Sequence, residues 1–363
     1  MEETKEVVKT DKFGDVTVYV SGDRKLRVFL TVHDIGQNHK SFHQFLLHED
    51  MKAILSKFCI VQITVPGQEE GAETLPNDTA SGFGSPALQR AFKASPSLRR
   101  AVSFKKSRPP SVTSDQPAPA PAPAPAPEKS DEQSYKFPTM QEMGTEVIPQ
   151  VLAALGCKSK DVVGLGVGAG ANILCRYAMV SAYDVLGLCL LECSAESAGF
   201  LEWGQEKIAS LQLNMKGMNP TSESYLIWHH YGNDLAKAKH QKLKEVHAFH
   251  DNLYKTMNPH NLACFVETYM ARTNFMDKLK TMKCRVLMVT GSRSAHVKDV
   301  EKTYTAMDRQ NSEILKLDGG DVMDDNPEKL AESMLFFLQG LGLVSSVRSK
   351  KMSRGTSLSG TDA

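Results

Sequence analysis

Short apolar runs alternate with segments of helical periodicity along most of the chain. Residues 25–32 (KLRVFLTV) and 58–65 (FCIVQITV) are almost continuously hydrophobic, as a strand is when helices cover both faces of its sheet. Further runs of this kind occupy residues 161–167, 185–194, 284–292 and 312–321. The pattern predicts an α/β fold with a mostly parallel central sheet and flanking helices.

Helical spacing of apolar residues is visible between these runs. Residues 139–156 place Met143, Val147 and Val151 on one helix face, although Pro149 is unfavourable inside a helix. Helices are also predicted over residues 171–183 and 326–342, and residues 200–282, which lack strand signals, predict a helical cap.

Two segments interrupt the alternation because they are poor in apolar residues. Residues 74–134 are rich in glycine, serine and proline, then basic, then a Pro/Ala run, and residues 344–363 form a basic, serine-rich tail. We expect both segments to be disordered. The predicted organisation is an α/β domain over residues 1–73, 135–199 and 283–343, with the insertion at 74–134, the helical cap at 200–282 and the tail at 344–363.

Composition narrows the function classes. The net charge of +1 gives no overall field for binding nucleic acid, so no nucleic-acid partner is expected. The seven cysteines are odd in number and lie in apolar segments, which favours reduced, buried thiols in an intracellular protein. The charged first residues lack the apolar core of a signal peptide. The most apolar tract, residues 162–191, contains Arg176 and Asp184 and is better explained by buried strands and a helix than by a membrane span.

A glycine-rich turn, residues 164–171 (GLGVGAGA), joins a predicted strand to a predicted helix. The dinucleotide motif G-x-G-x-x-G would need glycine where Ala169 stands, and a P-loop would need G-K-[ST]. The remaining interpretation is the nucleophile elbow G-x-S-x-G of α/β hydrolases, with Gly168 in the nucleophile's position. Glycine also avoids the backbone strain that a serine bears there.

The other positions of a hydrolase triad also lack catalytic groups. The acid's usual place after the strand at 284–292 holds Ser294, and the histidine's place after the last strand holds Gly320. Since losing the nucleophile alone lowers turnover by about 10⁶-fold in a serine protease, no serine-hydrolase activity is expected. The alternatives are a hydrolase with a displaced nucleophile, such as Cys193, and a sensor that binds a small molecule in the old pocket. That vestigial pocket would be lined by His33, Asp34, Gly36, Val167 and Ala169.

Histidines form a second set of candidate residues. His39 and His43 stand four residues apart on a predicted helix and could share a metal ion, but no third ligand is evident, so solvated or capping histidines are favoured and no metal or cofactor is predicted. His229 and His230 lie in the cap region, where a surface position is the default. We expect His33 and Asp34 to brace the loop that follows their strand.

Several motifs closely resemble the N-myc downstream-regulated (NDR) family. They include LTVHDIGQNHKSF (residues 30–42) and VVGLGVGAGANIL (162–174), and the resemblance runs in order over about residues 26–75 and 137–343. It implies an α/β-hydrolase fold with a helical cap, no hydrolase activity, and a cytoplasmic role in signalling, stress response or differentiation, in some members at endosomes or phosphoinositide-bearing membranes. The basic, Pro/Ala-rich insertion and the short tail without repeats depart from the family pattern.

Regulation is predicted in the polar segments. For the basic stretches 90–108 and 348–354, a solvated tract is the simplest interpretation, and an anionic membrane surface is the functional alternative. Basophilic kinases are the expected modifying partners, because basic residues precede most of the candidate phosphosites Ser103, Ser353, Thr356 and Ser357. Together these features predict a non-enzymatic signalling or adaptor protein that acts through protein partners, which the sequence leaves unidentified.

Overall fold

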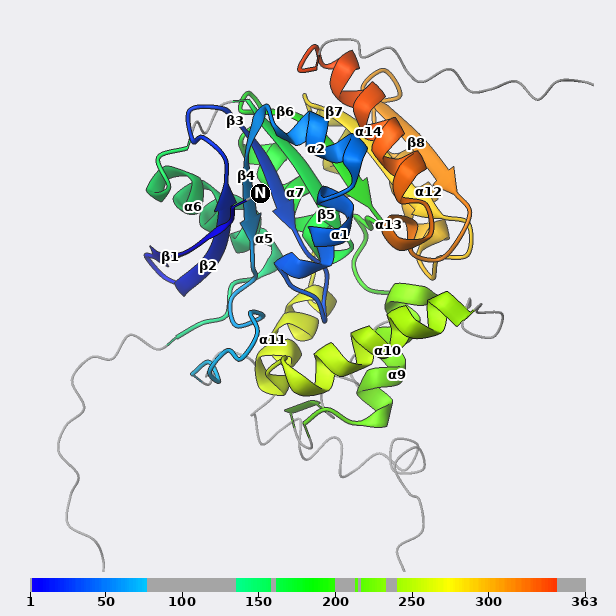
Figure 1. Cartoon of the computed structure of the whole chain (residues 1–363). Helices are drawn as coiled ribbons and strands as arrows, with labels where there is room; N and C mark the ends of the chain where they lie inside the picture. Colours follow the sequence, from blue (N-terminus) through cyan, green and yellow to red (C-terminus); the bar gives the residue numbers. More distant parts are fainter. Residues whose placement is uncertain are drawn as a thin grey trace, which may run out of the picture.

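The computed structural model describes residues 2–76, 135–157, 161–199, 213–214, 217–232 and 240–344. Its centre is an eight-stranded sheet in the order β1-β2-β4-β3-β5-β6-β7-β8 (Figure 1). The strands are β1 (Thr4–Thr10), β2 (Gly14–Ser21), β3 (Arg27–Val32), β4 (Phe58–Ile63), β5 (Val162–Val167), β6 (Val185–Leu191), β7 (Arg285–Gly291) and β8 (Ser312–Leu317). Most of the insertion and of the tail, with both basic stretches and all four candidate phosphosites, lies outside the described residues.

The sheet is parallel from β4 to β8, as the apolar runs predict. Its other end is an antiparallel hairpin of β1 and β2, and β2 also pairs antiparallel with β4. This hairpin was not predicted, because β1 is an edge strand whose mostly exposed residues carry charged side chains rather than a continuous apolar run.

Apolar residues fill both faces of the sheet. Along β3, Val28 and Leu30 belong to one buried cluster and Phe29 to the other, as the alternation of side chains on a strand requires. Helices α6 (Ile148–Ala154), α7 (Ala169–Val180) and α12 (Val297–Thr305) contribute to the first cluster, and α1 (His43–Leu46), α2 (Glu49–Leu55), α13 (Val322–Asp325) and α14 (Pro327–Gly340) to the second. The near-continuous hydrophobicity of the strands follows from this double cover.

The predicted helix over residues 139–156 is present but not uniform. It consists of α5 (Met140–Glu142), a π-helical segment η3 (Met143–Val147) and α6, and Thr139 and Glu142 form a capping box at its start. Pro149 lies in the first turn of α6, directly after the π-helical segment. A proline cannot donate the α-helical hydrogen bond to the carbonyl four residues back, and the change of helix type occurs where that bond is missing.

The cap consists of α9 (Pro220–Tyr231), α10 (His240–Lys255) and α11 (Pro259–Met270), followed by η5 (Met276–Thr281). In Figure 1 the three α-helices gather at one end of the sheet, below the strands. All seven cysteines are free, and all but the half-buried Cys264 are buried, as predicted. Among the described residues, no helix is both long and apolar enough to cross a membrane.

Candidate functional site

The glycine-rich turn forms a sharp elbow between β5 and α7. Gly168, at the junction, has φ +50° and ψ −111°, a backbone conformation that L-residues rarely adopt. Gly170 faces the carbonyl of Val32, and a β-carbon there would overlap that carbonyl oxygen. The glycines therefore let α7 begin directly against the end of β3.

The Asp34 carboxylate occupies the space beside this elbow. Its Oδ1 accepts hydrogen bonds from the N–H of Ala169 at 2.8 Å and from its neighbour Ile35 at 2.8 Å. In α/β hydrolases, the residue after the nucleophile and the loop after β3 supply the N–H donors that stabilise the oxyanion. In this protein the Asp34 carboxylate accepts hydrogen bonds from the N–H groups at both of these positions. A β-carbon on Gly168 would overlap the same carboxylate.

Two cap histidines close over this carboxylate. His229 Nε2 donates to Asp34 Oδ2 at 2.9 Å, and the hydrogen bond between His230 Nε2 and the Ile35 carbonyl is 2.7 Å long. The surface position predicted for both histidines is wrong: His229 is 3% and His230 9% exposed. The signal was present in α9, because Tyr225 and Leu226 precede His229 by four and three residues and so share its buried face.

The charges at Asp34 are set by these contacts. Burial acts to raise the pKa of Asp34, but the imidazoles of His229 and His230 and the N–H of Ala169 outweigh it and hold the pKa below its usual range. Burial lowers the pKa of His230 to about 4, so this ring is neutral at pH 7. Asp34 is therefore an ionised carboxylate enclosed by donors.

The loop after β7 reaches the same cluster. His296, 4% exposed, lies beside the cap, and its Nε2 is 3.2 Å from His229 Nδ1, within hydrogen-bonding distance. Burial lowers the pKa of His296 to about 3. Helix α9 is capped by Gly232, where a β-carbon would meet the backbone of Arg293 and Ala295. The cap is thus in close contact with the loops after both β3 and β7.

Ser294, in the acid's position, is paired with Glu192 at the end of β6. Its hydroxyl donates to Glu192 Oε2 at 2.8 Å and accepts from the His296 N–H at 3.1 Å. Glu192 also accepts from the Thr290 hydroxyl and the Gly291 N–H, each at 2.8 Å. Burial raises the pKa of Glu192 to about 7 even though these hydrogen bonds lower it. Sequence reasoning did not identify Glu192 as part of the site. The backbone of Glu192 has a φ of +52°, which only the structure reveals.

Gly320, in the histidine's position, follows β8. Its N–H donates to Asp325 Oδ2 at 2.9 Å, and a β-carbon on the preceding Gly319 would overlap the Asp325 side chain. The structure thus places backbone and the carboxylate of Asp325, the last residue of α13, at this position.

The residues predicted to line a vestigial pocket lie together, but cap side chains fill part of the space above them. A β-carbon on Gly36 would meet Leu226, Leu253 and Phe249 at 3.3–3.4 Å. His33 is fully buried; its Nε2 accepts from the Val65 N–H at 3.0 Å, so Nδ1 carries the proton and donates to the Asp34 carbonyl at 2.8 Å. These bonds brace the loop as expected. Val167, 9% exposed, and Ala169, 0% exposed, complete the set.

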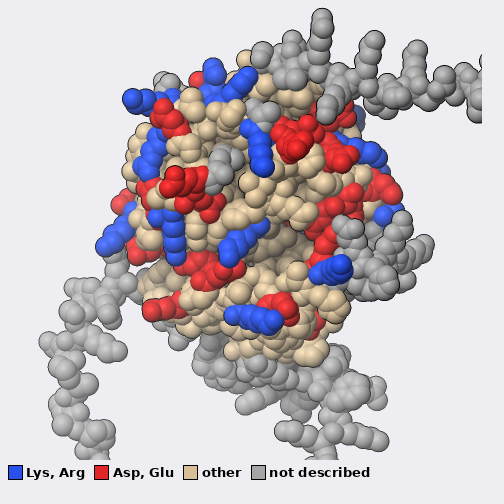
Figure 2. Space-filling view, viewed as in Figure 1, with Lys and Arg blue, Asp and Glu red and all other residues tan. Residues whose placement is uncertain are grey.

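The charged surface gives no second candidate on the face that Figure 2 shows. Lysine and arginine side chains are interspersed there with aspartate and glutamate, consistent with the net charge of +1. The pair His39 and His43, by contrast, is brought close to a carboxylate. Solvated or capping positions were favoured for both, but His39 is 3% exposed and the N-cap of its helix η1 (His39–Phe42) is Asn38, so neither applies to His39.

Comparisons with known proteins agree with this architecture. A family model described as "Ndr family" matches residues 6–90 and 124–345. The chain is 29% identical over 362 residues to "Uncharacterized protein ZK1073.1" of Caenorhabditis elegans, covering 97% of this chain and 90% of that protein. It is 27% identical over 353 residues to "Protein NDRG1" of Xenopus tropicalis, covering 94% of this chain and 72% of that protein.

Solved structures of hydrolases share the fold. A thermophilic esterase from Thermogutta terrifontis superposes with a TM-score of 0.64 at 12% identity, over 93% of this chain and 99% of the esterase. An enol-lactonase from Burkholderia xenovorans LB400 superposes with a TM-score of 0.62 at 10% identity, over 92% of this chain and 100% of that chain. These likenesses confirm the predicted α/β-hydrolase fold and say nothing further about activity.

Proposed function

The chain belongs to the Ndr family, and on that premise we propose that it is a non-enzymatic protein that uses an α/β-hydrolase fold as a scaffold for protein partners in cytoplasmic signalling. One observation carries the proposal: the Asp34 carboxylate accepts from both N–H groups that would otherwise stabilise an oxyanion. A reaction that develops negative charge at this point would face a fixed negative charge instead of free donors.

The remaining positions support the same conclusion. Gly168 offers no nucleophile, Ser294 is hydrogen-bonded to Glu192, and Gly320 offers no imidazole. The cap is hydrogen-bonded to the loop after β3 through His229 and His230, which leaves the elbow covered.

A hydrolase with a displaced nucleophile is the competing function, because the fold is that of esterases. Its candidate, Cys193, is fully buried, and its Sγ lies 3.9 Å from the Sγ of Cys175. A fully buried thiol is out of reach of an ester substrate, so this cysteine is better explained as part of the core.

Ester turnover by the purified full chain tests the proposal. With p-nitrophenyl acetate and butyrate we expect no release above the buffer rate, and no difference between the wild type and Cys193→Ala. Saturable turnover that disappears in Cys193→Ala would establish the displaced nucleophile and refute the non-enzymatic proposal.

The sensor alternative needs space beneath the cap, where Leu226, Phe249 and Leu253 pack close to Gly36. We therefore expect a thermal-shift screen with small metabolites to show no stabilisation. A ligand that raises the melting temperature of the wild type but not of Gly36→Leu would favour the sensor.

Regulation through the tail belongs to the same proposal. Residues 348–354 carry a charge of +4 from two arginines and two lysines, and phosphate on Ser353 would lower it to about +2 and so weaken binding to an anionic surface. Co-sedimentation with phosphatidylserine-containing vesicles should decrease for Ser353→Asp and stay unchanged for Ser353→Ala. Equal sedimentation of both variants would contradict control by phosphate at Ser353, and no sedimentation of the wild type would remove the membrane from the list of partners.

A further inference from the structure

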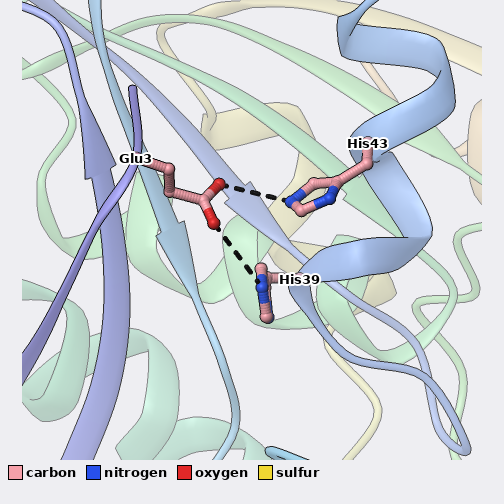
Figure 3. Close-up of side chains that lie close together, drawn as sticks. All are labelled: Glu3, His39 and His43. Atoms are coloured by element: carbon pink, nitrogen blue, oxygen red, sulfur yellow. Dashed lines mark hydrogen bonds and ion pairs between the residues drawn. The ribbon is translucent and has the colours of Figure 1, made fainter. Parts of the chain in front are cut away.

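The structure brings a third side chain to the histidine pair that the sequence left without one. Glu3, directly before β1, points between His39, the first residue of η1 (His39–Phe42), and His43, the first residue of α1 (Figure 3). Among the described residues, this is a group of three whose potential ligand atoms all lie within 4.8 Å of one another. Glu3 is 36 residues before His39, so no local spacing motif reveals the group.

The separations within the cluster fit a common metal ion. His43 Nε2 lies 3.2 Å from Glu3 Oε2, and His39 Nε2 lies 3.7 Å from Glu3 Oε1. Ligand atoms bound tetrahedrally at about 2.0–2.2 Å are about 3.3–3.6 Å apart. The two imidazole nitrogens lie within 4.8 Å of each other, so the three side chains would have to draw together to bind one ion at these bond lengths.

Neighbouring residues hold two of the three ligands in place. The Gln62 amide donates to Glu3 Oε2 at 2.6 Å, and the Tyr19 ring stacks on His39 with 3.4 Å between ring centroids. Hydrogen bonds to a ligating carboxylate and packing of a ligating ring are the supports that orient protein ligands to a metal.

An ordinary ion pair does not explain the whole arrangement. His43 and Gln62 are both hydrogen-bonded to the Glu3 carboxylate, whereas His39 Nε2 is too far from this carboxylate for a hydrogen bond. The other ring nitrogen, Nδ1 of His39, is buried without a hydrogen-bond partner. A metal ion bound at Nε2 would supply the polar partner that Glu3 is too far away to provide, and Nδ1 would then carry the proton of the ring.

We propose that Glu3, His39 and His43 bind a Zn²⁺ ion. Two imidazole nitrogens and one carboxylate oxygen suit zinc and its first-row neighbours, whereas Ca²⁺ and Mg²⁺ prefer oxygen ligands only. His43 is about one-third exposed, so a fourth position faces solvent and can hold water. The bound ion would link the start of the edge strand β1 to the segment that follows β3.

Zinc titration of the full chain, without a polyhistidine tag, tests this site. Isothermal titration in the presence of a competing chelator should show one Zn²⁺ per wild-type chain. Glu3→Gln and His43→Gln should each weaken this binding at least about 100-fold, and Gln62→Leu about tenfold. Mg²⁺ should not compete.

His250→Gln is the matched control. The His250 side chain is 40% exposed, against 37% for His43, and it also lies near carboxylates, Glu223 at 3.7 Å and Asp251 at 3.4 Å. We expect this variant to bind zinc like the wild type. Glu3 and His43 are both partly exposed, so their variants should fold, and circular dichroism checks this.

A second readout separates a shared site from loose surface binding. Co²⁺ in a site of low coordination number gives intense visible absorption bands, which should appear with the wild type and disappear with Glu3→Gln. The proposal is overturned if the wild type binds no stoichiometric Zn²⁺, or if Glu3→Gln and His43→Gln bind as tightly as His250→Gln.

Discussion

A β-carbon placed on Gly168 would overlap the Asp34 carboxylate. Any other residue at this position would also have to adopt the φ of +50° that Gly168 has. The missing side chain at the elbow and the carboxylate beside it are therefore linked, because the carboxylate fills the space that a side chain would need. Among the described residues, position 168 is therefore one that should tolerate no side chain.

Gly168→Ala should lower the free energy of unfolding by at least about 3 kcal/mol, because strain and overlap add. Gly156→Ala is the control: Gly156 has φ +63°, but no atom lies within 4 Å of the point where a β-carbon would sit, so only about 1 kcal/mol of strain is expected. Urea denaturation measures both. Equal losses would mean that Asp34 does not restrict position 168.

Glu192→Gln should change how stability depends on pH. The pKa of Glu192 is raised to about 7 in the folded protein, so the folded state holds its proton more tightly than the unfolded chain does. Its contribution is complete below the unfolded pKa of about 4.5 and is lost as pH rises through about 7. Between pH 5 and pH 8 the wild type should lose about 3 kcal/mol relative to Glu192→Gln in urea denaturation.

Glu313→Gln is the control for this prediction, because Glu313 is exposed on β8 and its variant should follow the wild type. If the stability of Glu192→Gln changed with pH in parallel with that of the wild type, the assignment would be contradicted.

At the scale of elements, helix α9 carries the contact between cap and sheet domain. His229 and His230 reach the loop after β3, and Gly232 packs on the loop after β7. The pattern of the sequence predicts the cap as helical, but the partners of α9 depend on how the cap is placed over the sheet. The hairpin of β1 and β2 was missed for a related reason, since an edge strand needs only one buried face.

His229→Ala should loosen this contact. It leaves Asp34 Oδ2 and His296 Nε2 without the imidazole between them, at a cost of about 2–4 kcal/mol. Hydrogen exchange should rise in α9 and in residues 33–37 while the β1–β2 hairpin keeps its protection. His247→Ala, exposed on α10, should leave the pattern unchanged. Uniform protection in His229→Ala would show that α9 is held by apolar packing alone.

At the scale of the whole molecule, four buried histidines among the described residues are neutral at pH 7 in the folded protein. The pKa values of His33 and His230 are lowered to about 4 and those of His39 and His296 to about 3, in each case chiefly by burial. Unfolding releases these rings to water, where they take up protons below about pH 6.5. Their contribution to stability is therefore present above pH 6.5 and is lost as pH falls toward 4.

Acidification from pH 7 to pH 5 should therefore cost the wild type stability. The four histidines together lose about 7 kcal/mol, and the proton held by Glu192 offsets about 2 kcal/mol of it. Urea denaturation at both pH values should show a net loss of about 5 kcal/mol. His296→Gln should reduce the histidine part by about one-quarter, whereas an unchanged loss would mean that this ring is not neutral in the folded protein.

The order of residues alone specifies the parallel strands, the reduced cysteines and the glycine elbow. These features depend on periodicity, composition and short-range geometry, which neighbours along the chain determine. What surrounds them is settled by the folded arrangement. The Asp34 carboxylate is hydrogen-bonded to Ala169, 135 residues later in the sequence, and to His229, 195 residues later. These contacts form because strand order and cap placement bring the loops together. Glu3 reaches His39 and His43 for the same reason, since contacts between distant segments arise from packing that no local pattern encodes.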